Sequence, residues 1–62
     1  MKINVNFTLE VSDDAGLREL ANADDNAEAR LFVKAEAQDL IRGYLEDNGL
    51  RPKILRDATE IS

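Results

Sequence analysis

The stretch AEARLFVKAEAQDLIRGYLEDN, residues 27–48, decides the fold of this chain. It contains no proline, and its one glycine, Gly43, comes late, so nothing in it prevents a single long helix. At 100° per residue, its apolar and acidic side chains fall on opposite sides of that helix. An apolar stripe is formed by Val33, Ala37, Leu40, Ile41, Tyr44 and Leu45, with Leu31 at its edge. An acidic ridge is formed by Glu28, Glu36, Asp39 and Glu46.

The rest of the chain offers little to cover such a stripe. At 62 residues it is one domain, residues 1–62, and a chain of this size buries about 60% of the surface that its unfolded form exposes. Cysteine and histidine are both absent, which excludes disulfides and the usual zinc sites as extra stabilisation. We therefore expect a homodimer or higher oligomer. The predicted contact between copies contains Val5, Phe7, Val33, Leu40, Ile41, Tyr44 and Leu45.

The net charge of −5 argues against nucleic acid and anionic membranes as partners, although a local patch can escape this average. The acidic residues either keep a small apolar protein soluble or bind another protein. In the second case the partner-binding residues are predicted to be Glu28, Phe32, Glu36, Asp39 and Glu46. No apolar run reaches the ~20 residues that a membrane span needs, and residues 1–4 lack the features of a signal peptide. The expected location is the cytoplasm.

The N-terminal residues predict a half-buried β-strand. Apolar Ile3, Val5, Phe7, Leu9 and Val11 alternate with polar residues, and this is the period of a strand. At the other end of the chain, Leu55, Thr59 and Ile61 share one alternating face, which fits either a second strand or a loosely held arm. The expected fold class is α+β: an N-terminal strand, a short helix, a long amphipathic helix and an extended tail.

Local signals mark the ends of both helices. Ser12 is a suitable N-cap for a short helix over about residues 14–22. Asp25, followed three positions later by Glu28, predicts a capping box that opens the long helix. Asn48-Gly49 then supplies the left-handed residue that ends it. Phe32 projects among the acidic side chains, where either the short helix folds over it or another subunit meets it.

The residues needed for catalysis or for cofactors are scarce. Without histidine and cysteine, the common general base and the strongest side-chain nucleophile are both missing, so we do not expect an enzyme and we predict no cofactor. Asp24, Asn26 and Glu28 alternate as cation ligands do, but the glycine and the distant glutamate of a calcium-binding EF-hand loop are absent. Helix capping explains these three residues better.

An N-terminal strand followed by two helices resembles the ribbon-helix-helix regulators over about residues 2–48. In that family the strands of a dimer pair and enter the major groove of DNA. The resemblance implies a DNA-binding alternative in which the outward side of the strand reads bases, since asparagine pairs well with adenine. The DNA-contacting residues are then Lys2, Asn4, Asn6 and Thr8. The chain departs from that family in two ways: acidic residues, Asp24 and Asp25, precede its second helix, and this helix is longer than is usual in the family.

The opening KINVNFTLEV, residues 2–11, also resembles small uncharacterised proteins of actinobacterial bacteriophages. In those proteins an acidic stretch follows, and then a helix that ends in the pattern found here from Leu45 to Leu50. The resemblance implies a phage-encoded accessory protein in the host cytoplasm, and it implies no catalytic or binding residue. The leading expectation is therefore a non-enzymatic accessory protein that self-associates and binds a host or virion protein.

Overall fold

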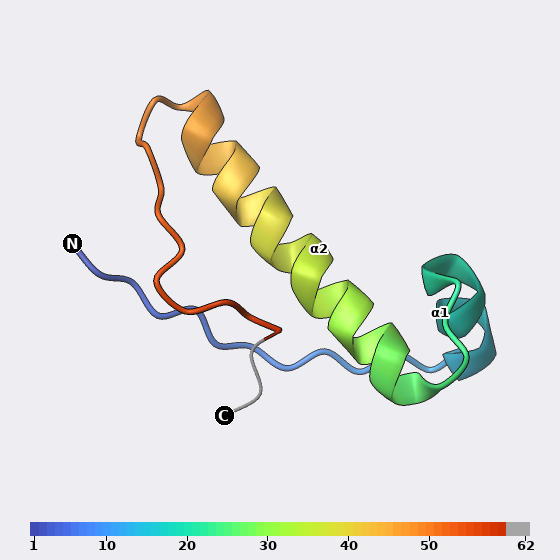
Figure 1. The fold of residues 1–62 in the computed structure, drawn as a ribbon. Helices are drawn as coiled ribbons and strands as arrows, with labels where there is room; N and C mark the ends of the chain where they lie inside the picture. The colour runs from blue at the N-terminus through green and yellow to red at the C-terminus, as the bar shows by residue number, and fades with distance from the viewer. Residues whose placement is uncertain (60–62) are drawn as a thin grey trace.

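The computed structural model describes residues 1–59, which form two helices joined by a short turn. Helix α1 spans Asp14–Ala21 and helix α2 spans Asn26–Asp47. Figure 1 shows α1 beside the first turns of α2, while the segment that follows α2 runs back along it. The part of the chain that is described is therefore all-α, with a short helix before a long one.

The predicted α+β fold is wrong, because neither residues 1–11 nor residues 49–59 form a strand. A strand needs a second strand to satisfy its backbone hydrogen bonds. The tail, the only candidate in the sequence, contacts α2 instead: the backbone N–H of Ala58 donates to Oε1 of Gln38 at 2.6 Å. Residues 1–11 therefore find no second strand to pair with among residues 1–59, in spite of their alternating pattern. Ile61, expected to share a face with Leu55 and Thr59, lies outside the described residues.

Helix α1 is fixed by caps at both ends. Its N-cap is Asp13, whose Oδ1 accepts a hydrogen bond from the Gly16 N–H at 2.9 Å, so the predicted cap at Ser12 is wrong by one position. Aspartate caps as well as serine does, and its charge favours the positive end of the helix dipole. Asn22 ends the helix with a left-handed backbone, φ 53°, which asparagine tolerates better than most residues.

Both ends of α2 confirm the predicted signals. Asp25 Oδ1 accepts from the Glu28 N–H at 2.9 Å, and Glu28 Oε2 accepts in return from the Asp24 N–H at 3.0 Å. At the other end Gly49 adopts a positive φ of 73°, and the Leu50 N–H donates to the Leu45 carbonyl at 3.0 Å. These contacts lie within a few residues of one another in the sequence, which is why the helix ends could be predicted.

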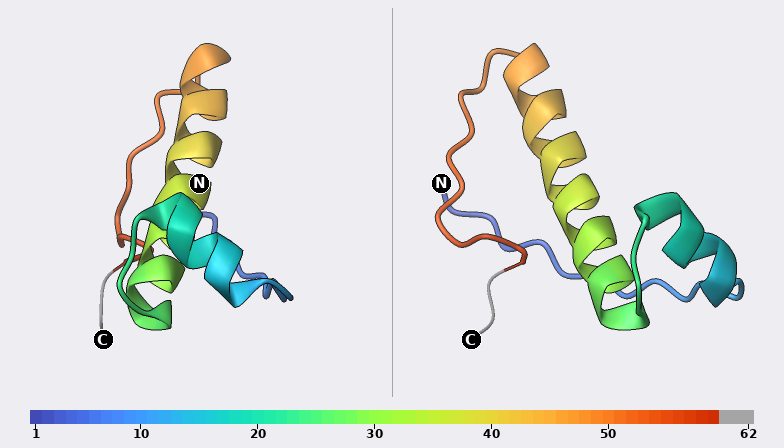
Figure 2. Two further views of the ribbon diagram at one scale, coloured as in Figure 1. Left: turned by 90° about the vertical axis from the view of Figure 1, so that its right-hand side faces the viewer. Right: turned by 45° about the vertical axis from the view of Figure 1, so that its right-hand side comes forward.

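The two helices enclose very little. Ala29, only 1% exposed, is the single buried apolar residue among residues 1–59. The radius of gyration is 13.4 Å, whereas a compact domain of this length has about 10–11 Å. Figure 2 shows the reason: the N-terminal segment is a single trace that reaches beyond the helices, and the tail is a single trace that runs back beside α2. The fold therefore places apolar side chains around α2 without covering them.

Candidate interaction surface

Apolar side chains line the surface of this molecule where a larger protein would bury them. Fourteen large hydrophobic residues are exposed within residues 1–59. They are Met1, Ile3, Val5, Phe7, Leu9, Val11, Leu20, Leu31, Leu40, Ile41, Tyr44, Leu50, Ile54 and Leu55. Single exposed apolar residues are normal on protein surfaces, but so many in so short a chain indicate that part of this surface binds another macromolecule.

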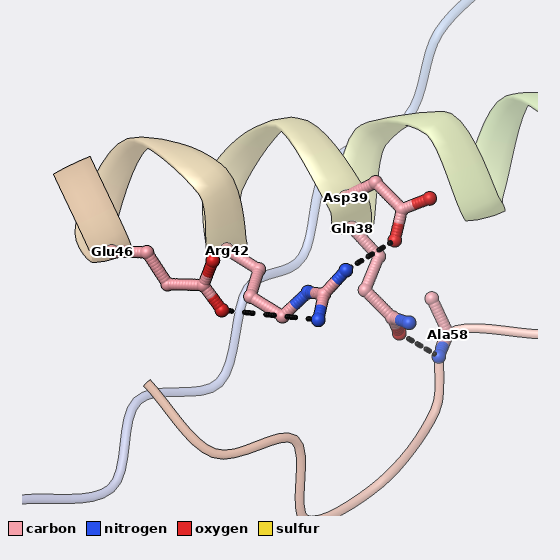
Figure 3. Close-up of polar contacts among 5 residues, drawn as sticks. All are labelled: Gln38, Asp39, Arg42, Glu46 and Ala58. Carbon is pink, nitrogen blue, oxygen red and sulfur yellow. Dashed lines mark hydrogen bonds and ion pairs between the residues drawn. The ribbon is translucent and has the colours of Figure 1, made fainter. Parts of the chain in front are cut away.

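The apolar stripe of α2 is split between two sides of the helix. Leu40 and Tyr44 are 72% and 69% exposed, whereas Leu45 is half-buried. Val33 lies on the side of Leu40 but nearer the start of α2, where it is half-buried too. Leu45 lies about 140° around the helix axis from Leu40, at 100° per residue. It faces the tail, as does Gln38, whose hydrogen bond to Ala58 is drawn in Figure 3. The side of α2 that carries Leu40 and Tyr44 is left open.

An open groove of about 630 Å³ lies on the tail side of α2. Its apolar lining comes from the N-terminus, the end of α2 and the tail, and two cationic side chains complete it. The lining residues are Met1, Ile3, Leu45, Leu50, Arg51, Pro52, Lys53 and Leu55. The groove therefore combines an apolar lining with two cationic side chains, Arg51 and Lys53.

The acidic ridge offers less negative charge than the sequence predicts. Arg42 lies between two of its members, with Nη2 at 3.5 Å from Asp39 Oδ1 and Nη1 at 3.8 Å from Glu46 Oε1 (Figure 3). Glu28 is engaged in the cap of α2, which leaves Glu36 as an exposed ridge carboxylate outside these contacts. Exposed ion pairs add little stability, but Arg42 does offset the local charge that was to attract a partner.

Phe32, the remaining predicted partner-binding residue, is half-buried rather than exposed. It therefore offers a partner less surface than its position among the acidic residues indicates. Of the two explanations drawn from the sequence, burial within the monomer is the one that this exposure favours.

The four predicted DNA-contacting side chains, Lys2, Asn4, Asn6 and Thr8, are all exposed. They do not lie on a strand, however, since residues 1–11 contain none. DNA binding through paired strands therefore stays a prediction that nothing in the described chain favours.

The alternating residues Asp24, Asn26 and Glu28 lie before and within the first turn of α2. Asn26 Oδ1 accepts from Arg18 Nη1 at 2.6 Å, which ties α1 to α2, while Glu28 accepts from the Asp24 N–H. Among residues 1–59 there is no cluster of three histidine, cysteine or acidic side chains placed to hold a metal ion. Of these three residues, Glu28 therefore has the predicted capping role, whereas the Asn26 side chain contacts α1 instead.

One carboxylate in the tail has a perturbed pKa. Hydrogen bonds from the Thr59 hydroxyl at 2.6 Å and from the Thr59 N–H at 2.8 Å hold the pKa of Asp57 below its ordinary value of 3.8. A weaker effect in the same direction comes from the Gln38 side chain. Asp57 is fully exposed, so it serves as a local turn residue and not as an acid or base for catalysis.

No family model, no curated protein and no solved structure matches this chain. The resemblances to phage accessory proteins and to ribbon-helix-helix regulators therefore stay untested. Neither helix of the described residues is long and apolar enough to span a membrane. The exposed apolar side chains and the groove are the features of the described residues from which a function is proposed below.

Proposed function

We propose that this chain is a small non-enzymatic accessory protein that acts as an assembly of its own copies and binds another protein. The observation that carries the proposal is the near absence of a core. Ala29 is buried, yet Leu40 and Tyr44 of α2 and the apolar side chains of residues 1–11 face solvent. A fold with so little burial lacks its main source of stability, and a second chain can supply it.

The exposed area gives the size of the missing contact. A compact monomer of 6.9 kDa exposes about 4,000 Å², whereas this chain exposes 5752 Å². The excess is about 1,750 Å² per chain. This is more than the roughly 800 Å² that each partner buries in an interface of standard size, so the exposed surface has room for a contact between copies and for a separate partner.

Two separate surfaces allow self-association and partner binding at the same time. Leu40 and Tyr44 occupy the open side of α2, while Ile3 lines the groove on the tail side. We assign the open side to the contact between copies. We assign residues 1–11 and the groove to the partner. Val5 and Phe7, which the sequence predicts to lie between copies, thereby move to the partner-binding surface. The partner is expected to present apolar side chains and a negative charge, because Arg51 and Lys53 line the groove.

Sedimentation equilibrium at micromolar concentration tests self-association. We expect a mass that is a multiple of 6.9 kDa for the wild type, and we expect Leu40→Asp and Ile41→Asp to dissociate and unfold the protein. Leu20→Asp is the matched control, because Leu20 is 74% exposed but lies on α1. A folded Leu40→Asp variant that keeps the wild-type mass would contradict the proposal.

Binding of another protein is tested by pull-down from host lysate with two surface variants. One carries Val5→Ser and Phe7→Ser, and the other carries lysine at Glu36, Asp39 and Glu46. We expect the first variant to lose the wild-type partners and the second to keep them, since Arg42 already offsets part of the ridge charge. If only the second variant fails to capture the wild-type partners, the partner binds the acidic ridge and not residues 1–11. A wild type that captures nothing above background would contradict partner binding.

A further inference from the structure

The end of α2 contains the one asparagine of this chain that a glycine follows. Asn48 precedes Gly49, whereas the other asparagines precede Val5, Phe7, Ala23 and Ala27. Asparagine is among the chemically labile residues of proteins, because the backbone nitrogen of the next residue can attack its side-chain amide carbon. A glycine leaves that nitrogen unhindered, since it has no Cβ. We propose that Asn48-Gly49 is a site of spontaneous covalent modification, and that the C-terminal cap of α2 controls its rate.

The reaction needs only hydroxide and water. Hydroxide takes the proton from the Gly49 backbone nitrogen, and this nitrogen forms a bond with Cγ of Asn48. The Cγ–Nδ2 bond breaks, and Nδ2 leaves as ammonia after taking a proton from water. Water then opens the resulting succinimide ring. Opening at Cγ leaves aspartate at position 48, whereas opening at the main-chain carbonyl carbon leaves isoaspartate, whose backbone runs through Cβ and Cγ. Water is taken up and ammonia is lost, with no oxidation or reduction.

The closed cap holds Asn48 in a conformation that cannot react. At its ψ of 8°, the Gly49 nitrogen nearly eclipses the backbone nitrogen of Asn48, so it is turned away from Cβ and from the Cγ that it must attack. Two hydrogen bonds oppose the rotation that ring closure requires. The Gly49 N–H donates to the Glu46 carbonyl at 2.9 Å, and Asn48 Nδ2 donates to the Tyr44 carbonyl at 2.8 Å. The first of these bonds also keeps the proton on the attacking nitrogen.

Little apart from these bonds keeps the cap closed. Asn48 and Gly49 are exposed, and an added Cβ at Gly49 would meet no other atom within 4 Å. Leu50, whose N–H donates to the Leu45 carbonyl at 3.0 Å, is itself 66% exposed. Exposed helix ends open locally at a much lower free energy than the whole fold. The modification therefore proceeds in the folded chain, at a rate set by the fraction of time for which the cap is open.

Both products disrupt the end of α2 irreversibly. Aspartate lacks the Nδ2 donor to the Tyr44 carbonyl, and it adds a negative charge at the negative end of the helix dipole. Isoaspartate also adds one carbon atom to the backbone before Gly49, which shifts the N–H groups of Gly49 and Leu50 away from their acceptors on α2. Since Leu50 and Arg51 line the groove, the modification changes the groove as well.

Mass spectrometry of the peptide that contains Asn48 measures the rate in the full chain, at neutral and at mildly alkaline pH. We expect modification both in buffer and in urea, faster at the higher pH and about tenfold faster in urea, where both hydrogen bonds of the cap are broken. Asn22 is the control within the same chain. It is also an exposed C-cap residue, but Ala23 follows it, so we expect Asn22 to stay unmodified.

Leu50→Pro tests the cap in the folded chain. It leaves Asn48 and Gly49 in place but removes the N–H that donates to the Leu45 carbonyl. We expect this variant to react faster than the wild type in buffer and at the wild-type rate in urea. Leu50→Ala, which keeps the N–H, is the matched control and should react at the wild-type rate in both. Circular dichroism checks that α2 is retained.

The comparison of the wild type in buffer and in urea decides the proposal even if Leu50→Pro unfolds. Equal rates in buffer and in urea would overturn control by the cap. An unmodified Asn48 after incubation in urea would overturn the site itself. Modification of Asn22 at the rate of Asn48 would show that Gly49 does not select the site.

Discussion

Shortening Leu40 to alanine tests the energetic role of the open side of α2. Leu40→Ala removes three carbon atoms, each of which contributes about 0.8 kcal/mol when it leaves water. Since Leu40 is 72% exposed in the single chain, its burial by a second copy contributes about 1.7 kcal/mol. A symmetric dimer loses this contribution twice, about 3.5 kcal/mol, which raises the dimer Kd by a factor of about 300. The helix itself tolerates the change, since alanine is the best helix former.

The assay is sedimentation equilibrium over a range of concentrations, with Leu20→Ala as the matched control. Leu20 is 74% exposed and the substitution is identical, but the residue lies on α1. We expect the Kd of Leu20→Ala to stay within about threefold of the wild type, a change of less than 1 kcal/mol. Equal Kd values for the two variants would refute the assignment of the open side to the contact between copies.

Three further predictions concern the fold of the single chain. Asp25→Ala removes the N-cap of α2 and should lower the free energy of unfolding by about 1 kcal/mol, measured by urea titration. Gly49→Ala should lower the free energy of unfolding by about 1 kcal/mol, because Gly49 has a φ of 73°. Gly43→Ala, in an open helical position, should raise that free energy by a similar amount. Equal effects of the two substitutions would contradict the assignment of Gly49 to the C-terminal cap of α2. Because the pKa of Asp57 is depressed in the folded chain, the turn that it forms with Thr59 should add stability above the ordinary pKa of 3.8. This stability should be lost as the pH falls through the depressed pKa. Thr59→Val should raise the pKa of Asp57, as measured by an NMR titration.

The two helices could be predicted because their ends are set by neighbouring residues. Asp25 and Glu28 are three positions apart, and Gly49 directly follows the C-cap Asn48. Capping contacts join residues only a few positions apart, so the residues that set each helix end can be read directly from the sequence. The sequence does not decide between Ser12 and Asp13 as the cap of α1, because each of these neighbouring side chains is a good N-cap for a helix that begins directly after it.

The absent strand could not be predicted, because pairing depends on distant residues. Alternation in residues 1–11 shows which side chains would share a face, but a strand also needs a second backbone beside it. The tail bonds to α2 through Gln38 and Ala58, twenty positions apart, and no local pattern indicates this contact. The ion pairs of Arg42 are a different case, because Asp39 lies three positions before it and Glu46 four positions after it, so helical spacing in the sequence does indicate both contacts.

The concentration dependence of thermal unfolding tests the central claim most directly. If copies of the chain complete one another's core, the melting midpoint followed by circular dichroism should rise steadily as the protein concentration is increased from micromolar to millimolar. A cooperative transition whose midpoint is the same at every concentration would show that the single chain of 6.9 kDa folds without a second copy.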